Sequence, residues 1–264
     1  MSQPFNISVF LFLFALLTSC QKEIQINSSS FHPTPLIIDL PSNFPPIDHP
    51  EENPLTEEGV NLGRHLFWET KLSGNNTISC ANCHLPQYAF TEPNSFSTGI
   101  HGDLGTRNAM VLQNLAWSND FFWDGRALTL ENQILVTISD STEMDETWEN
   151  FLNEIRYDNR YRELFYNAFG ILNPDSTHAA KALAQFIRTM VSTNSKFDQF
   201  LRQELPLSQE ESAGYASFND LNGGDCFHCH GGILGTDNSY KNNGLDEFPL
   251  DSGRGLVTNI ESDY

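Results

Sequence analysis

Two stretches, Cys80-Ala81-Asn82-Cys83-His84 and Cys226-Phe227-His228-Cys229-His230, share one pattern: two cysteines three positions apart, followed directly by a histidine. Two thiols one helical turn apart can add across the two vinyl groups of a haem, and the next residue presents an imidazole nitrogen to the iron. A thiol–disulfide redox pair and a four-cysteine zinc site also use Cys-x-x-Cys. Neither explains the histidine after both pairs, and the pairs lie further apart than in ordinary zinc modules. The pattern therefore predicts two covalently bound haems c, ligated by His84 and His230, with His228 as a bystander.

A similar helix start precedes each of these motifs. Thr56 can cap a helix whose first turn is acidic, and Ser208 with Glu211 has the spacing of a capping box. In both expected helices a glycine lies four positions before a phenylalanine. This internal repeat predicts two related haem domains rather than one domain with two unrelated motifs.

The region between the motifs contains one clear amphipathic helix. Ala180, Leu183 and Ile187 recur at helical spacing after a cap at Asp175 or Ser176, and the expected role of this helix is packing. No long period-two pattern indicates strands. We therefore expect a mainly α protein with two cytochrome c-like haem domains and long loops. The N-terminal haem domain would span residues 55–195 and the second haem domain residues 196–264.

The N-terminal region is typical of an exported lipoprotein. A short apolar run leads to Leu17-Thr18-Ser19-Cys20, so residues 1–19 are expected to be a signal peptide and Cys20 the lipidated first residue. The alternative is an ordinary signal peptide in which Cys20 is incidental, and the first six residues lack the usual Lys or Arg. Residues 20–54, rich in Pro and Ser, would form a tether or wrapping arm. We expect a periplasmic protein that meets the membrane only through this lipid.

The formal net charge of −20, with only 14 Lys and Arg in 264 residues, argues against nucleic-acid binding, which needs clustered basic side chains. An acidic surface could attract a basic electron-donor protein by long-range forces. A solvated acidic face is the more common explanation of such a charge. Charge alone does not choose between these two interpretations.

Several stretches besides the haem motifs match a known family: Leu62–Phe67, Ala89-Phe90, Gly102–Asn108, Phe122–Ala127, Leu130–Gln133, Glu143-Met144, Phe197-Asp198 and Asp251-x-Gly253-Arg254. Through them the chain resembles the bacterial di-haem cytochrome c peroxidases, a family that includes the enzyme that matures methylamine dehydrogenase. The resemblance covers nearly everything from Leu55 onward. It implies that the first haem handles peroxide and that His84 is its permanent ligand.

The resemblance also implies roles for residues around the first haem. His101 would bind the opposite face of its iron in the resting state, and the glycines beside it give the loop freedom to carry it away; otherwise it is a surface-loop histidine. Glu143 would be the catalytic carboxylate that moves a proton from the near peroxide oxygen to the departing one, and Gln133 would line the same pocket. Without the resemblance, Glu143 reads as an exposed acid at a helix start. Trp123 would lie between the haems, or be a plain core aromatic.

The second haem, held by Cys226, Cys229 and His230, would receive electrons from a donor protein. Its outer ligand, a Met or a Tyr in the family, is expected beyond Tyr264, because every methionine precedes the second motif. We therefore expect the second domain to be incomplete at its C-terminus. The family also binds Ca²⁺ between the domains, for which Asn108 would be a ligand; an ordinary loop amide is the alternative.

Three functions are open from the sequence. The first is reduction of hydrogen peroxide to water with electrons from a small cytochrome or copper protein. The second is electron transfer by a di-haem carrier without catalysis. The third is oxidation of a substrate, as in the methylamine-related branch. A homodimer is a further expectation from the resemblance.

Overall fold

The computed structural model describes residues 31–242, 245 and 251–263, and these residues form helices and loops. Within them, paired backbone segments are limited to isolated bridges, such as the one between Phe121 and Ala127. The expectation of a mainly helical fold is therefore confirmed. The predicted signal peptide and Cys20 lie outside the described residues.

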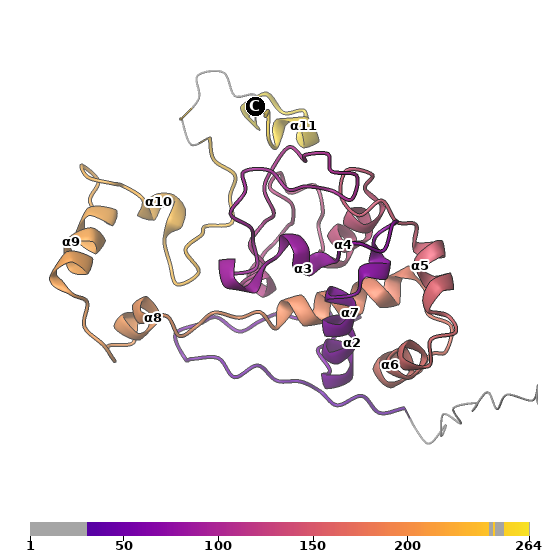
Figure 1. Cartoon of the computed structure of the whole chain (residues 1–264). Helices are drawn as coiled ribbons and strands as arrows, with labels where there is room; N and C mark the ends of the chain where they lie inside the picture. The colour runs from indigo at the N-terminus through magenta and orange to yellow at the C-terminus, as the bar shows by residue number, and fades with distance from the viewer. Residues whose placement is uncertain (1–30, 243–244, 246–250, 264) are drawn as a thin grey trace, which may run out of the picture. The chain divides into compact units, whose positions relative to one another are not determined.

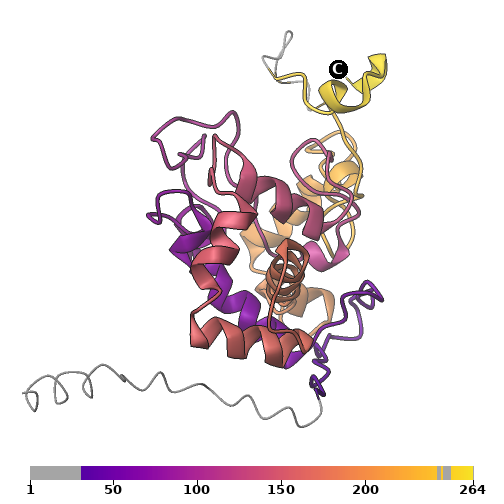
Figure 2. The ribbon, with the colours of Figure 1, turned by 90° about the vertical axis from the view of Figure 1, so that its right-hand side faces the viewer.

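Helix α7 (Ser176–Arg188) is the centre of the helical core. It contacts α2 (Glu57–Phe67), α4 (Leu130–Ser139), α5 (Trp148–Ile155) and α6 (Asn159–Phe169) (Figure 1). Figure 2 views α7 nearly along its axis, with other helices around it. The amphipathic helix expected between the two cysteine motifs is therefore confirmed as a packing element.

The shorter helices lie in the loops and near the second cysteine motif. They are α3 (Cys80–Cys83), α8 (Lys196–Leu201), α9 (Gln209–Phe218), α10 (Phe227–His230) and α11 (Gly255–Thr258), with 3-10 turns at Thr70–Leu72, Pro86–Tyr88, Leu115–Trp117 and Glu261–Asp263. None of the helices described is long and apolar enough to cross a bilayer.

The helix starts follow the capping residues that the sequence indicated. The Thr56 hydroxyl accepts from the Gly59 backbone N–H at α2, and the Asp175 carboxylate accepts from the His178 N–H at α7. Ser208 and Glu211 form the expected capping box at α9. Each cap satisfies backbone donors that the first helical turn would leave unpaired.

Helices α2 and α7 approach closely because small residues line their contact. A Cβ atom on Gly63 would lie 1.9 Å from the Ala182 carbonyl oxygen, so this position of α2 admits only glycine without a backbone shift. Four alanines of α7 are buried along its length: Ala179, Ala180, Ala182 and Ala184. At the end of α2, the Phe67 ring packs against Phe186 of α7, with 5.4 Å between the ring centroids.

The described part of the Pro-rich arm, residues 31–54, lies against the core. Phe44 is buried and its ring centroid lies 5.9 Å from that of Trp117. The Trp117 indole N–H donates to the Pro45 carbonyl at 3.1 Å. At the end of the arm, the Asn53 side chain is buried among polar groups of α4 and α7.

A buried polar network joins Asn53 to both helices. Arg188 of α7 donates to both carboxylate oxygens of Glu131 of α4, at 2.6 and 3.0 Å. The Asn53 amide donates to Glu131 at 2.6 Å and accepts from the Gln185 amide at 2.9 Å. Burial alone would raise the pKa of Glu131, but the hydrogen bond and charge of Arg188 hold that pKa below its usual value. The pair is therefore charged at neutral pH and sets the position of α4 on α7.

Arg188→Met is expected to lower the free energy of unfolding by about 3–5 kcal/mol, because it leaves the Glu131 charge buried without its partner. The two side chains are only 7% and 16% exposed. Denaturant titration of the holoprotein measures the change. Lys196→Met is the matched control, since it breaks an ion pair with Glu211 that is 51% and 42% exposed, and should change little. A loss below about 1 kcal/mol for Arg188→Met would contradict the structural role of the pair.

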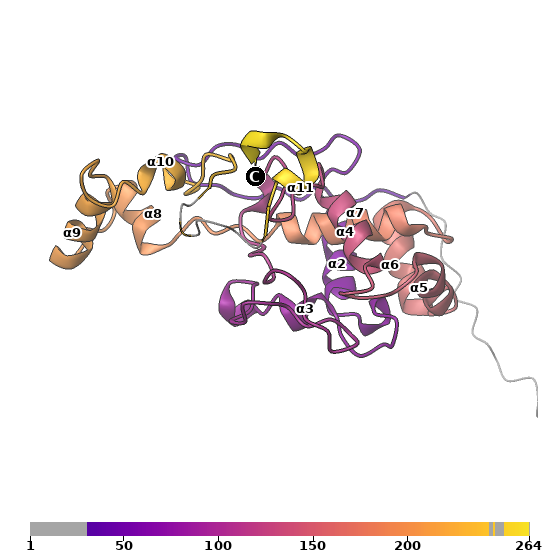
Figure 3. The ribbon, with the colours of Figure 1, turned by 90° about the horizontal axis from the view of Figure 1, so that it is seen from above.

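The chain around the second cysteine motif packs differently from the chain around the first. The buried apolar side chains of the described residues all lie between Phe44 and Met190. Helix α9 repeats the cap of α2 but has no buried residue. It contacts α8 through a group of three aromatic rings, Phe197, Phe200 and Tyr215, and the two helices lie side by side in Figures 1 and 3. The repeat is thus visible in helix order, whereas a second buried core is not formed by the described residues.

Candidate functional site

A cavity of about 240 Å³ lies beside the first cysteine motif. Its walls come from α3, α4, α7 and the loops around residues 97–112, 122–126 and 140–144. Seven of the predicted site residues line it: Cys80, Cys83, His84, Asn108, Trp123, Gln133 and Glu143. Residues spread over 64 positions of sequence therefore meet at one site, as the resemblance implied.

Helix α3 places the two thiols of the first motif on one turn. Ser79 precedes it, and the Asn82 side chain accepts from the Ser79 backbone N–H at 2.8 Å. Both cysteines are free, and burial raises the pKa of Cys80 to about 12 and that of Cys83 to about 11. Two thiols on one turn beside a cavity have the spacing that addition to the two vinyl groups of a haem requires.

The zinc alternative finds no support in the described part of the chain, where no three His, Cys, Asp or Glu side chains gather to hold a metal ion. The two cysteine pairs lie on separate helices, α3 and α10.

His84 is held in the orientation that a haem ligand requires. Its Nδ1 lies 2.9 Å from the Phe90 carbonyl oxygen, so Nδ1 carries the proton and Nε2 is the nitrogen that would bind iron. Burial lowers the pKa of His84, which keeps the imidazole neutral as ligation requires. The cysteines, the anchored imidazole and the mainly apolar walls fit a covalently attached haem.

Helix α4 presents one face to the cavity. Leu130, Gln133, Ile134, Thr137 and Ile138 follow the spacing of three and four that places side chains on one side of a helix. The predicted Gln133 thus shares this face with Thr137. Sequence reasoning missed Thr137, although its position one turn after Gln133 is a usable signal.

Glu143 enters the same cavity from the loop after α4. Burial is the main reason that its pKa is raised, to about 7, and the charge of Asp140 adds to this rise. Arg126 and a hydrogen bond with Thr137 act in the opposite direction. A carboxyl group with this pKa can both take up and release a proton near neutral pH, which is what general acid–base catalysis requires.

Trp123 lies at the rim of the cavity rather than within the core. Its side chain is 50% exposed, and its indole N–H donates to the Asn108 carbonyl oxygen at 3.0 Å. The side chain of Asn108 remains a predicted Ca²⁺ ligand, and Trp123 remains a predicted link between the haems. The hydrogen bond connects these two predicted residues directly.

The structure does not bring His101 to the cavity wall. Its side chain is 54% exposed and forms an ion pair with Asp145, with 2.7 Å between Nε2 and Oδ2. Gly102, with a φ of 83°, supplies the left-handed turn next to it. The loop thus holds His101 outside in this structure, and its role as a ligand stays a prediction.

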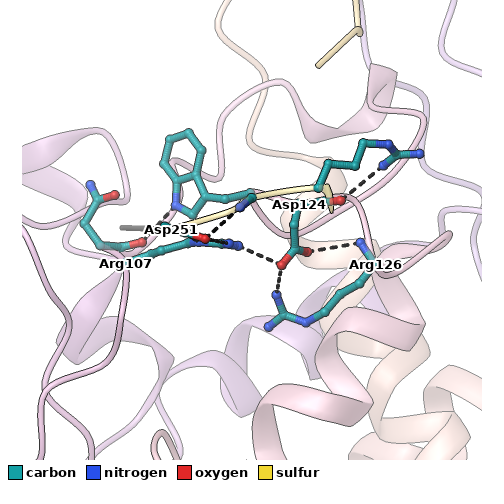
Figure 4. Close-up of polar contacts among 8 residues, drawn as sticks. Arg107, Asp124, Arg126 and Asp251 are labelled. Carbon is teal, nitrogen blue, oxygen red and sulfur yellow. Dashed lines mark hydrogen bonds and ion pairs between the residues drawn. The ribbon is translucent and has the colours of Figure 1, made fainter. Parts of the chain in front are cut away.

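An ionic group at the rim was not predicted from the sequence. Asp124 accepts from Arg107 at 2.7 Å and from Arg126 at 2.8 Å (Figure 4). Arg107 also donates to Asp251 through Nη2 at 2.7 Å, and Arg254 donates to the Asp124 carbonyl at 3.1 Å. The hydrogen bond from Arg107 lowers the pKa of Asp251 to about 2. Two stretches that match the family, one before and one after the second haem motif, therefore contact each other here.

Gly125 is required at this contact. Its φ is 70°, and a Cβ atom there would lie 2.2 Å from the Tyr240 hydroxyl oxygen and 2.3 Å from Arg254 Nη1. Tyr240 in turn donates its hydroxyl to Asp120 at 2.5 Å. A side chain at position 125 would be strained by the positive φ and would displace the ends of the Tyr240 and Arg254 side chains.

The second cysteine motif repeats the local geometry of the first. His230 Nδ1 lies 3.2 Å from the Gly235 carbonyl oxygen, as His84 Nδ1 lies against Phe90. Cys226 and Cys229 are free and partly exposed. The His228 side chain pairs with a carboxylate instead, with 2.5 Å between its Nδ1 and Asp225 Oδ1, and its role as a bystander stays a prediction.

The fold and the two motifs define a class: helical proteins built to carry two haems c. A profile of the di-haem cytochrome c peroxidase family matches residues 57–205, and the chain belongs to this family.

Among its relatives, methylamine utilization protein MauG of Methylophilus methylotrophus is 34% identical over 210 residues, which is 79% of this chain and 62% of that protein. The cytochrome c peroxidase Ccp of Escherichia coli is 31% identical over 225 residues, which is 81% of this chain and 47% of that protein. The chain thus spans between about half and three fifths of the length of these relatives.

A solved structure of a MauG-like protein associated with microbial copper homeostasis is similar, with a TM-score of 0.78 and 29% identity, over 86% of this chain and 72% of that one. The di-haem peroxidase BthA of Burkholderia thailandensis shares the fold, with a TM-score of 0.61 over 68% of this chain and 50% of that one.

Proposed function

We propose that this protein is a cytochrome c peroxidase that reduces hydrogen peroxide to two molecules of water, with two protons and with two electrons from a small donor protein. The observation that supports this most directly is the shared cavity of Cys80, Cys83, His84 and Glu143, in which Glu143 has a pKa of about 7. A haem bound there supplies an iron that binds peroxide and passes electrons to it.

Glu143 performs the proton transfer in this proposal. As a carboxylate it would accept a proton from one peroxide oxygen, and as a carboxylic acid it would return that proton to the other, departing oxygen. Gln133 on the neighbouring face of α4 orients peroxide through its amide. Apolar neighbours such as Ile134 and Ile138 exclude water, which strengthens these polar interactions.

The second motif supplies the electron entry point. Cys226, Cys229 and His230 would hold the second haem, and Trp123 would lie on the path inward. The donor protein, export to the periplasm, a lipid at Cys20, a Ca²⁺ ion at Asn108 and a homodimer belong to the proposal as expectations from the family and from the N-terminal pattern.

The protein, exported with both haems by a host competent in cytochrome c maturation, is expected to oxidise a reduced small cytochrome when hydrogen peroxide is added. Absorbance of the donor measures the turnover. A di-haem carrier would exchange electrons with the donor at the same rate with and without peroxide, and would show no high-spin iron after half-reduction. That result would replace the peroxidase proposal.

The similarity to MauG supports a second candidate, an oxidase of the methylamine-related branch. The outer ligand of the second haem separates the two, because true peroxidases are expected to use a methionine and that branch a tyrosine.

A further inference from the structure

Positively charged side chains lie at the edge of the cavity beside the first motif, and the proposed proton transfer by Glu143 does not require them. Among the described residues that line it, Arg107 and Arg126 are the ones with a permanent positive charge. They come from two different loops and converge on the nearly buried carboxylate of Asp124, whose side chain is 9% exposed (Figure 4).

The two arginines differ in how many of their nitrogens are already used. Arg107 donates through Nε and Nη2 to Asp251 and through Nη1 to Asp124. Arg126 donates through Nη1 to Asp124, and in the described part of the chain no protein acceptor takes its Nε or Nη2. Its guanidinium lies 3.5 Å from the centroid of the Phe122 ring, which fixes the plane of the group. Arg126 is therefore held in place with donors left over for another anion.

A haem brings such an anion. Its two propionates lie on the half of the porphyrin ring opposite the vinyl groups, and Cys80 and Cys83 hold the vinyl half. A carboxylate that enters a mainly apolar cavity must be paired and hydrogen-bonded, and a planar guanidinium is the side chain that matches it. Arg126 and Glu143 line the same cavity, and the positive charge of Arg126 acts to lower the pKa of Glu143.

We propose that Arg126 binds a propionate of the first haem, with Asp124 as the positioning residue that aims its guanidinium. Arg107, which also donates to Asp251, donates to the same Asp124 carboxylate and helps to hold it in place. Because Asp251 follows the second haem motif in the chain, this segment takes part in the environment of the first haem. The inference rests on the haem attachment proposed above and adds to it the residue that receives the carboxylate.

Arg126→Gln is expected to lower the midpoint potential of the first haem and leave that of the second unchanged. Loss of a positive charge beside the haem disfavours the reduced iron, and we expect about a tenfold change in the equilibrium constant, which is 59 mV for a one-electron couple. Redox titration of the holoprotein, followed by the spectrum of each haem, measures both potentials. Arg126→Lys keeps the charge and should retain most of the wild-type potential. Asp251→Asn should raise the potential of the first haem, since it removes a negative charge from the same group.

Arg202→Gln is the matched control, because Arg202 is also ion-paired, with Glu204 at 2.8 Å, but does not line the cavity. If Arg126→Gln moves the potential no more than this control in protein whose mass shows two haems, the inference is wrong and the peroxidase proposal stands. If Arg126→Gln does not retain the first haem, the Arg126→Lys variant tests the inference instead. A tenfold change in the redox equilibrium constant of the first haem in Arg126→Lys would contradict a charge interaction, because lysine keeps the positive charge. A wild-type mass without haem would instead contradict the proposed function before any titration.

Discussion

Glu143→Gln is expected to reduce peroxidase turnover by about 10²- to 10⁴-fold while both haems stay attached. Glutamine keeps the size and hydrogen-bonding capacity of the side chain but cannot accept and return a proton. The Glu143 carboxyl reaches the cavity that Cys80 and His84 line, so its loss acts on the proton transfer itself. Steady-state oxidation of a reduced donor cytochrome at saturating peroxide measures the effect.

The matched control is Glu149→Gln, which removes an exposed carboxylate in the first turn of α5. It should leave turnover unchanged. Full turnover in Glu143→Gln, with two haems confirmed by mass, would remove the main reason to prefer a peroxidase over an electron carrier.

The raised pKa of Glu143 also predicts the form of the pH profile. Below a pH of about 7 the carboxyl is largely protonated and cannot accept the peroxide proton. The second-order rate constant for peroxide is therefore expected to rise as the pH increases through about 7, and this rise should be absent in Glu143→Gln. An identical profile in both proteins would assign the proton transfer to another group.

Cys80→Ser combined with Cys83→Ser is expected to yield a protein that carries one haem in place of two and has no peroxidase activity. Thioether bonds to the first haem cannot form without the thiols, whereas the second motif on α10 is independent of them. Intact mass and the haem absorbance per polypeptide measure the loss. The corresponding Cys226→Ser and Cys229→Ser protein should also lose one haem but keep the cavity with Glu143 and its own haem.

If the first double variant keeps the mass of the two-haem protein, Cys80 and Cys83 are not the attachment sites. If both double variants lose a haem but the first still turns over peroxide, the catalytic site lies at the second motif.

The sequence predicted those features that depend on near neighbours in the chain. Thr56, Asp175 and Ser208 cap helices through hydrogen bonds to backbone groups three residues away, so the capping pattern and the helix starts agree. The cysteine pairs and the histidines after them lie within single turns, and the carbonyl that orients His84 is six residues further along.

Long-range packing decided which segments far apart in the sequence contact each other. Arg254 donates to Asp124 across 130 residues of sequence, and Arg107 donates to Asp251 across 144 residues. No local sequence pattern predicts these contacts. The repeat in sequence did not reveal that α2 is packed against α7 while α9 has no buried residue, because burial depends on which partner covers a helix face.

By itself, then, the sequence predicted where haem would be attached and which histidines would ligate it, since covalent and capping chemistry acts over one helical turn. Only the tertiary structure decided that Glu143 has a pKa near 7 and that Arg126 lies at the cavity edge. Desolvation and charge interactions depend on the distances between side chains in space, and these are set when α4, α7 and the loops fold around one cavity.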